Sequence, residues 1–295
     1  MKHWIKAFRL RTLPLAFSCI IVGCGLAFAD GCFSLPLAIL LLTTTLFLQV
    51  LSNLANDYGD FVKGTDNEDR VGPERALQSG NISKPQMIKA IWIVSILCAA
   101  SGSLLIYWGT KGLSFYGFML FVLLGLLSIG AAIKYSVGKN AYGYAAMGDV
   151  AVFLFFGWVG VLGSYYLQAH SFHWMLLLPA TSIGLLSAAV LNINNMRDHV
   201  EDNKSGKKTL VTLFGLKTAK QYHLLLNICA IMAMVLYDSE LNIMLSVGIL
   251  LFVAPAIKIA YSNDHEKFDP FLKIQALGTF AYSLVFVFVS ELGMR

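Results

Sequence analysis

Charged residues are scarce in this sequence. Asp, Glu, Lys and Arg make up 13% of the 295 residues, whereas a soluble domain carries about 25%. Hydrophobic residues reach 57%, and the mean hydropathy is +0.67. This shortage excludes an ordinary soluble domain, because a surface so poor in charge requires lipid as its solvent. The formal net charge of +5 is only mildly basic, and we expect membrane lipid rather than nucleic acid as the surrounding partner.

Cysteine pairs of the metal-binding type are also lacking. None of the five cysteines stands in a C-x-x-C spacing, and all but Cys32 lie inside apolar runs. We therefore expect the cysteines to be small packing residues rather than disulfides or metal ligands.

Long polar linkers are missing as well, and long apolar runs take their place. A bilayer core of about 30 Å needs about 20 apolar residues per helix, and nine runs come close to this length. They are residues 13–29, 35–56, 87–108, 113–133, 150–168, 174–196, 219–236, 241–261 and 271–292. We predict an all-α membrane protein of about nine transmembrane helices around a central cavity open to the cytoplasm. It would form one intramembrane domain over residues 1–295.

The N-terminal residues carry a different pattern. Residues 4–11 alternate apolar and basic side chains, which predicts an amphipathic helix on the inner membrane surface. Residues 27–29 resemble the small-residue cleavage site of a secretory signal. The amphipathic stretch before them favours a segment that stays with the protein.

Basic residues are divided unevenly between the two sides of these helices. Of the 22 Lys and Arg residues, only Lys111 and Arg295 fall on the side opposite the N-terminal tail. The positive-inside rule therefore places the tail and the loops after the even-numbered helices in the cytoplasm. We predict a multi-pass protein of the inner, cytoplasmic membrane. The same side holds 13 of the 17 acidic residues, a bias that the rule does not explain and that we attribute to chemistry.

The second predicted helix ends in a polar motif. Asn53, Asn56, Asp57 and Asp60 follow the spacing i, i+3, i+4 and i+7, so they lie on one helix face. Polar groups at this depth are expensive unless they face a wet cavity. The motif therefore indicates a site at this end of the helix.

The sixth predicted helix ends in a matching motif, where Asn195, Asp198 and Asp202 also share one face. Each helix thus presents an i, i+4 pair, Asn56 with Asp60 and Asp198 with Asp202. Hard oxygen ligands without His or Cys suit Mg²⁺, and neighbouring basic side chains would pair with phosphate oxygens. These basic residues are Lys63, Arg70, Arg75, Arg197, Lys207 and Lys208. The sequence favours a magnesium-bridged diphosphate, with ordinary solvation of two helix ends as the alternative.

Both motifs extend into longer patterns. Residues 56–73 read N-D-Y-G-D-x-x-K-G-x-D-x-x-D-R-x-G-P, and residues 194–210 read N-N-M-R-D-x-x-x-D-x-x-x-G-K-x-T-L. In these motifs, and over nearly its whole length, the chain resembles the intramembrane UbiA-type prenyltransferases. Within them it resembles the 1,4-dihydroxy-2-naphthoate polyprenyltransferases of menaquinone synthesis. Position 64 is Gly, where the 4-hydroxybenzoate branch carries Asp, and this departure favours the naphthoate branch.

The resemblance implies roles for individual residues. Asn56 and Asp60 match the first metal-binding motif, and Asp198 and Asp202 match the second, with Asp60 and Asp198 required for catalysis. Asp149 is the candidate base for the acceptor hydroxyl, and a helix N-cap is the alternative reading. Residues expected to contact the substrates are Lys63, Arg75 and Arg197 at the diphosphate, Asn53 and Lys207 beside them, and Tyr135 toward the acceptor.

The implied reaction needs Mg²⁺, a polyprenyl diphosphate and 1,4-dihydroxy-2-naphthoate. The ring carbon that bears the carboxylate attacks the prenyl group, and CO₂ and diphosphate leave, giving demethylmenaquinol. Aromatic faces would stabilise the allylic cation. The candidates are Tyr58, Tyr135, Tyr142 and Tyr144, for which membership of the interfacial aromatic belt is the alternative.

Other functions fit parts of the pattern. Prenyl transfer to 4-hydroxybenzoate, haem, chlorophyll or glyceryl phosphate would use the same motifs. A secondary transporter is the alternative outside the enzymes, but transporters place ionisable residues near the bilayer midplane. Here the acidic residues gather at one membrane face, which favours an enzyme.

Overall fold

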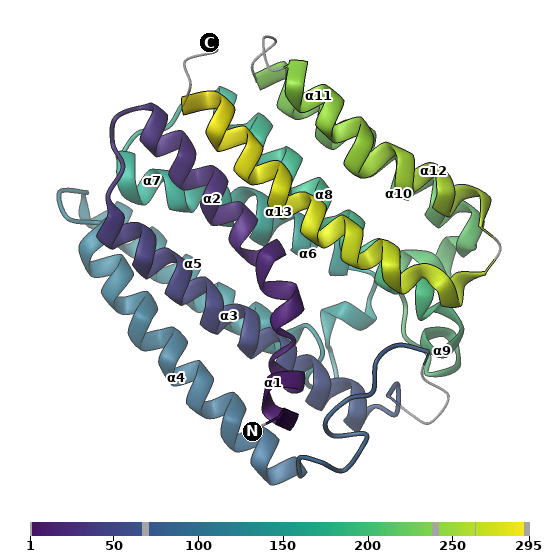
Figure 1. Cartoon of the computed structure of the whole chain (residues 1–295). Helices are drawn as coiled ribbons and strands as arrows, with labels where there is room; N and C mark the ends of the chain where they lie inside the picture. The colour runs from purple at the N-terminus through teal and green to yellow at the C-terminus, as the bar shows by residue number, and fades with distance from the viewer. Residues whose placement is uncertain (1, 67–70, 238–241, 263, 292–295) are drawn as a thin grey trace.

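The structure, a computed structural model, describes residues 2–66, 71–237, 242–262 and 264–291. This described part is helical, and its one β-type contact is an isolated bridge between Ala145 and Lys208. Nine of its helical stretches are long and apolar enough to cross a membrane. The predicted all-α fold with nine spans is therefore confirmed (Figure 1).

The spans follow the predicted apolar runs closely. They are α2 (Leu13–Ala29), α3 (Leu35–Val62), α4 (Lys84–Gly109), α5 (Phe115–Lys134), α6 (Gly148–Val152) with η3 (Phe153–Leu162) and α7 (Gly163–Ala169), η4 (Trp174–Leu176) with α8 (Leu177–Arg197), α10 (Leu210–Tyr237), α11 (Asn242–Gly248) with η5 (Ile249–Val253) and α12 (Ala254–Tyr261), and α13 (Asp269–Glu291). Two ends of predicted runs, residues 241 and 292, lie outside the described residues. Helix α3 continues to Val62, past the predicted end at residue 56, because its polar motif stays helical.

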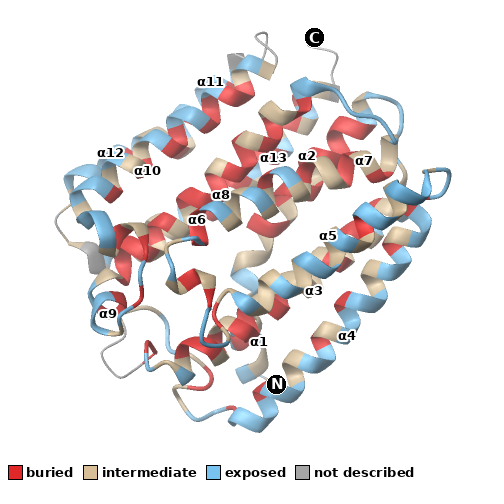
Figure 2. Cartoon of the chain, turned by 180° about the vertical axis from the view of Figure 1, so that it is seen from behind, coloured by how far each residue is buried: buried red, intermediate tan, exposed pale blue. Residues whose placement is uncertain are grey.

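Helix α8 lies at the centre of the bundle. It packs against α10, η3 and α13, and most of its length is buried, whereas Phe121 is the one buried residue of α5, whose other residues are intermediate or exposed (Figure 2). Large apolar side chains such as Leu126 and Leu250 are more than half exposed, as expected for residues that face lipid. The bundle therefore has a packed centre and an apolar rim.

Close helix packing around α8 depends on glycine. A Cβ atom at Gly157 of η3 would lie 2.7 Å from the carbonyl oxygen of Ala180 and 2.9 Å from the Cα atom of Gly184. Only glycine permits this approach between η3 and α8. The stretch Phe153–Leu162 is π-helical rather than α-helical, a local change that the apolar run at 150–168 did not indicate.

The N-terminal segment forms two short helices before the first span. Helix α1 (Lys2–Phe8) packs on α3, and the 3₁₀ helix η1 (Leu10–Thr12) follows it. The predicted helix over residues 4–11 is interrupted at Arg9, which has a left-handed backbone with φ of 48°. This break turns the Arg9 side chain toward the end of α3, where the candidate site lies.

Candidate active site

A cavity of about 650 Å³ runs through the bundle. It is lined by residues of η1, α2, α3, α4, α5, η3 and α8. Asn56 and Asp60 of the first motif line it, and so do Asp198 and Asp202 of the second. The two motifs, more than a hundred residues apart in sequence, therefore meet at one cavity, as the sequence predicted.

The amide groups of α3 hold the N-terminal segment and a distant loop. Asn56 accepts a hydrogen bond from Arg9 Nη2 at 2.8 Å and donates one to Ser136 Oγ at 2.8 Å. Asn53 donates to the backbone oxygen of Phe8 at 2.9 Å and to Thr12 Oγ1 at 3.1 Å. Asn53 lines the cavity, but these bonds use its amide to anchor the N-terminal segment.

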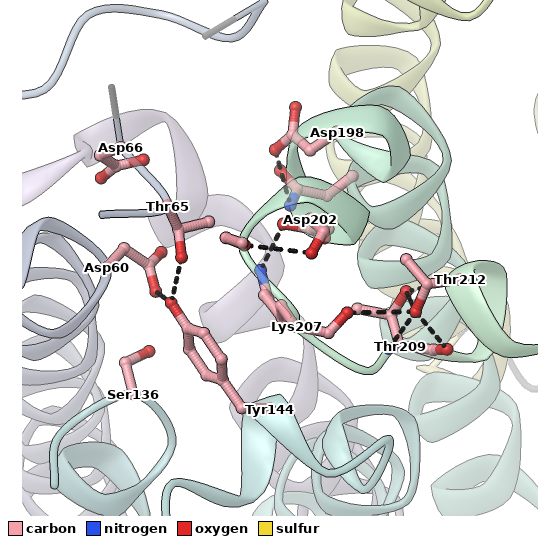
Figure 3. A network of polar contacts seen from close by, with 12 residues as sticks. Asp60, Thr65, Asp66, Ser136, Tyr144, Asp198, Asp202, Lys207, Thr209 and Thr212 are labelled. Carbon is pink, nitrogen blue, oxygen red and sulfur yellow. Dashed lines mark hydrogen bonds and ion pairs between the residues drawn. The ribbon is translucent and has the colours of Figure 1, made fainter. Parts of the chain in front are cut away.

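The Asp60 carboxylate is buried and has an aromatic partner. It is 3% exposed, and its Oδ1 accepts a hydrogen bond of 2.7 Å from the hydroxyl of Tyr144 (Figure 3). The same hydroxyl lies 2.7 Å from Thr65 Oγ1. Because a phenol has one proton, and Tyr144 gives it to Asp60, Thr65 is the donor in the second bond.

Lys63 lies beside the cavity rather than on its wall. Its ammonium donates to the backbone oxygen of Ser136 at 2.7 Å and lies 3.7 Å from the ring centroid of Tyr144. Burial lowers the pKa of Lys63, with the Asp60 carboxylate acting in the opposite direction and Lys207 in the same direction. The close approach of Ser136 to α3 is possible because position 59 is Gly, where a Cβ would lie 2.5 Å from the Ser136 oxygen.

In the second motif, Arg197 holds Asp198 with two hydrogen bonds. Its Nε and Nη2 donate to the two carboxylate oxygens at 2.6 and 2.8 Å, and its Nη1 donates to Asp269 at 2.6 Å. Nη2 also donates to Asn194 at 2.9 Å. Arg197 is 1% exposed, so its guanidinium is a buried part of the wall. It orients Asp198 as well as carrying charge toward the cavity.

Asp202 pairs with Lys207. The ammonium of Lys207 donates to Asp202 Oδ1 at 3.1 Å (Figure 3). Burial raises the pKa of Asp202 to about 6, with Lys207 lowering it and Asp198 raising it further. Burial lowers the pKa of Lys207, but the carboxylates of Asp202 and Asp60 outweigh this effect and hold it above its usual value. At neutral pH the pair is therefore ionised.

The donor atoms fit Mg²⁺ bound together with a ligand phosphate. Among the described residues, no three His, Cys, Asp or Glu side chains are close enough to hold a metal ion by themselves. Mg²⁺ is usually bound by one or two carboxylates, with water and substrate phosphate completing its octahedron. Asp202 Oδ2 is buried and accepts no hydrogen bond from any described residue, which makes it available to a cation.

Arg75 completes the basic side of the cavity. It lines the cavity, and its Nε lies 3.6 Å from Asp66 Oδ2. The motif residues Asp69 and Arg70 lie outside the described residues.

The predicted aromatic residues divide into two groups. Tyr135 and Tyr142 line the cavity with their ring centroids 5.4 Å apart and nearly perpendicular. Burial raises the pKa of both phenols, that of Tyr142 to about 12, so both are neutral at ordinary pH. Tyr58 and Tyr144 do not belong to the described lining of the cavity.

Asp149 is placed behind the cavity wall. It is 4% exposed, and its Oδ1 accepts no hydrogen bond from the described residues. The reading of Asp149 as a helix N-cap is wrong, because Met147 occupies the N-cap position of α6 and no side chain caps this helix. Gly148 brings α6 against Tyr135, with a Cβ position 3.2 Å from the Tyr135 hydroxyl. Asp149 is thus next to a residue of the wall without being on it.

Several residues at the site were not singled out from the sequence. Arg9 and Ser136 contact Asn56 directly, and Asn194 and Asp269 contact Arg197. The sequence pattern shows Arg9 only as a basic residue of the amphipathic tail. The one available signal was its place just before Pro14 and the first span.

Comparison with known proteins gives a consistent result. Residues 16–284 match the UbiA prenyltransferase family. The 1,4-dihydroxy-2-naphthoate octaprenyltransferase of Escherichia coli (strain K12) is 48% identical over 235 residues, 80% of this chain and 76% of that relative. The protein of the same name from Haemophilus influenzae is 40% identical over 294 residues, 99% of this chain and 87% of that relative.

Solved structures share the fold. A UbiA homolog from Archaeoglobus fulgidus bound to GPP and Mg²⁺ superimposes with a TM-score of 0.60 at 17% identity, covering 97% of this chain and all of that chain. An apo UbiA homolog from Aeropyrum pernix K1 gives 0.64 at 17% identity, covering 92% of this chain and 96% of that chain. At this identity the likeness concerns the fold alone.

Proposed function

The chain belongs to the UbiA prenyltransferase family, and from this membership we propose its reaction. It transfers a polyprenyl group from a polyprenyl diphosphate to 1,4-dihydroxy-2-naphthoate. The new bond joins the prenyl C1 to the ring, the C–O bond to diphosphate breaks, and the carboxylate leaves as CO₂. The electron pair of the broken C–CO₂ bond restores the aromatic ring, so no net proton is consumed.

One observation carries this proposal. The Asn56/Asp60 and Asp198/Asp202 pairs line one cavity, together with Arg9, Arg75, Arg197 and Lys207. Carboxylates and cations mixed at one end of an otherwise apolar cavity suit a diphosphate headgroup with an apolar tail. The acceptor follows from the two relatives that are 48% and 40% identical.

The metal is part of the proposal. Asn56 and Asp60 would hold one Mg²⁺, and Asp198 and Asp202 another. When bound, the ions would neutralise the diphosphate and make it a better leaving group. The chain's own cations share this task, because Lys207, with its raised pKa, stays protonated at any ordinary pH.

The aromatic and apolar walls serve the prenyl group. Tyr135 and Tyr142 face the cavity near its polar end, and each ring would stabilise an allylic cation by about 0.5–2 kcal/mol. The apolar wall from α4 and α5 keeps water from this cation. Asp149 would act through Tyr135. Its carboxylate would serve as the acceptor for the Tyr135 phenol, and the phenol would contact the hydroxyl of the naphthoate.

We place the polar end of the cavity at the cytoplasmic face of the inner membrane. This placement rests on the basic residues, of which only Lys111 and Arg295 fall on the opposite side. Cys32, exposed in the loop between α2 and α3, should then react with a membrane-impermeant maleimide added outside intact cells. If this thiol reacted only after the membrane was permeabilised, the orientation would be the opposite of the one proposed.

The test is an assay of the purified protein with Mg²⁺, a polyprenyl diphosphate and a carboxyl-labelled acceptor. We expect labelled CO₂ and prenylated product from 1,4-dihydroxy-2-naphthoate, and no turnover after Asp60→Ala or Asp198→Ala in protein that remains folded. If the protein prenylated 4-hydroxybenzoate and not the naphthoate, the proposed acceptor would be wrong and 4-hydroxybenzoate would take its place. Near-normal activity of either variant at saturating Mg²⁺ would contradict the metal assignment.

A further inference from the structure

Tyr144 lies between the two acidic motifs. Its hydroxyl donates to Asp60 of the first motif at 2.7 Å (Figure 3). Its ring centroid is 3.7 Å from the Lys63 ammonium and 5.5 Å from the Lys207 ammonium. Lys207 is also the partner of Asp202 in the second motif. One side chain therefore contacts a carboxylate of one motif and the counter-ion of a carboxylate of the other.

The backbone around Tyr144 fixes it to the second motif. The oxygen of Tyr144 accepts a hydrogen bond from the amide of Lys208 at 3.3 Å, and the amide of Ala146 donates to the Lys208 oxygen at 2.9 Å. These two bonds form the parallel bridge between Ala145 and Lys208. Tyr144 thus moves with the segment that carries Lys207, while its hydroxyl is bonded to α3.

The hydroxyl of Tyr144 has a defined direction. Thr65 donates to Tyr144, and Tyr144 donates to Asp60. This relay gives the Asp60 carboxylate a fixed orientation before any cation arrives. The ring of the same residue offers its negative face to Lys63 and Lys207, two cations that would otherwise repel each other.

We propose that Tyr144 is a positioning residue that sets the geometry of one motif relative to the other, so that both grip one metal-bound diphosphate. This inference rests on the proposed function. It differs from the expectation that Tyr144 shields the allylic cation, because the ring is taken up by two ammonium groups and lies off the cavity lining.

The test uses Tyr144→Phe, which keeps the ring and removes the hydroxyl. We expect the Mg²⁺ concentration for half-maximal activity of the full-length protein to rise about 10- to 100-fold, the usual effect of losing a hydrogen bond to a metal ligand. The kcat at saturating Mg²⁺ should stay within about twofold, since no group that touches the substrate is lost. Thr65→Val should shift the Mg²⁺ requirement in the same direction by less.

Tyr165→Phe is the matched control. Tyr165 is buried in α7, and its hydroxyl donates at 2.6 Å to Asp30, the residue that follows the C-terminal end of α2. This variant should keep the wild-type Mg²⁺ requirement. A wild-type Mg²⁺ requirement in Tyr144→Phe would overturn the inference, and so would a loss of kcat that excess Mg²⁺ does not restore.

Direct binding of Mn²⁺, followed by electron paramagnetic resonance, separates this inference from the proposed function. It needs no turnover and applies to the folded fraction of each variant. Weaker Mn²⁺ binding in Tyr144→Phe than in Tyr165→Phe would support the role of Tyr144 even if the acceptor were not the naphthoate. Equal binding in the two variants would refute it while leaving the transfer reaction intact.

Discussion

Each proposed metal ligand, at the end of α3, at Asp198 after α8 or in α9 (His199–Lys204), has its own protein partner. Asp60 is held by Tyr144, Asp198 by Arg197 and Asp202 by Lys207. Asn56 is held by Arg9 and Ser136 on its two sides. Each acidic group is therefore neutralised or oriented by its own partner before a cation binds. This arrangement keeps four polar groups at the end of an apolar bundle without an unpaired buried charge, which would be costly.

The raised pKa of Asp202, about 6, gives a prediction for the pH dependence. Only the carboxylate binds Mg²⁺, so below pH 6 the cation must displace a proton. The Mg²⁺ concentration for half-maximal activity should therefore increase as the pH falls from 6 to 5, and the increase should approach about tenfold per pH unit. A titration of activity against Mg²⁺ at each pH measures it, and Asp202→Asn should show a higher requirement with less pH dependence.

Protonation of Asp202 does not destabilise the fold, so acid unfolding through this residue would not account for a higher Mg²⁺ requirement at low pH. Its folded-state pKa lies above the ordinary 3.8, so the folded protein binds this proton more tightly than the unfolded chain. The contribution of Asp202 to stability therefore increases as the pH falls from 6 toward 4. An unchanged Mg²⁺ requirement between pH 7 and pH 5 would contradict the assignment of Asp202 as a ligand.

That Asn56, Asp60, Asp198 and Asp202 meet at one cavity could be predicted from the sequence, whereas their protein partners could not. Asn56 and Asp60 reveal themselves because an i, i+4 spacing puts both on one helix face, whatever the rest of the fold does. The contacts of Asn56 with Arg9 and Ser136 join residues 47 and 80 positions apart. No local pattern contains that information.

At the scale of elements, the loop from Tyr135 to Met147 can approach α3 closely because position 59 is glycine. Gly59 leaves room for Ser136, whose hydroxyl and backbone oxygen bond Asn56 and Lys63. The helices themselves were predictable, because their apolar runs match the bilayer thickness. The position of the loop was not predictable, since it depends on the absence of a Cβ atom at Gly59 of α3.

Gly59→Ala should therefore disturb the site. Its Cβ would lie 2.5 Å from the Ser136 oxygen, which forces the loop away from α3 at a cost of about 1–3 kcal/mol. We expect prenyl transfer to fall at least about tenfold, by loss of the Asn56 and Lys63 contacts. Steady-state assays and thermal melts of the detergent-solubilised protein measure both effects.

Gly130→Ala is the corresponding control. It also lies in a transmembrane helix, and a Cβ there would meet no atom within 4 Å. Activity and stability should stay close to wild type or improve slightly, because Ala favours helix over Gly. Equal behaviour of the two variants would show that the approach of Ser136 to α3 is unimportant.

At the scale of the whole molecule, the cavity joins the polar end to an apolar interior. Thr44 and Asp60 both line it, and their separation of 16 residues on α3 corresponds to a rise of about 24 Å. The interior end is shaped by Gly102, whose nearest neighbour beyond its own helix is Thr44. A long prenyl chain can extend through this region.

Gly102→Phe should shorten the usable cavity. The new ring would fill space beside Thr44 without reaching Asp60, so a short donor such as geranyl diphosphate should retain its kcat/KM. A long polyprenyl diphosphate should lose at least about tenfold in kcat/KM, the equivalent of about 1.4 kcal/mol. Gly130→Phe is the control that lies off the described cavity lining. Equal losses for both donors would mean that the prenyl chain does not pass Gly102.

The most direct measurement is the anomalous diffraction of Mn²⁺ in crystals grown with a non-hydrolysable prenyl diphosphate analogue. We expect two Mn²⁺ ions in the cavity, one beside Asn56 and Asp60 and one beside Asp198 and Asp202, both bound to the same diphosphate. Mn²⁺ at only one motif, or a diphosphate bound away from both, would contradict the claim that the two motifs form one site.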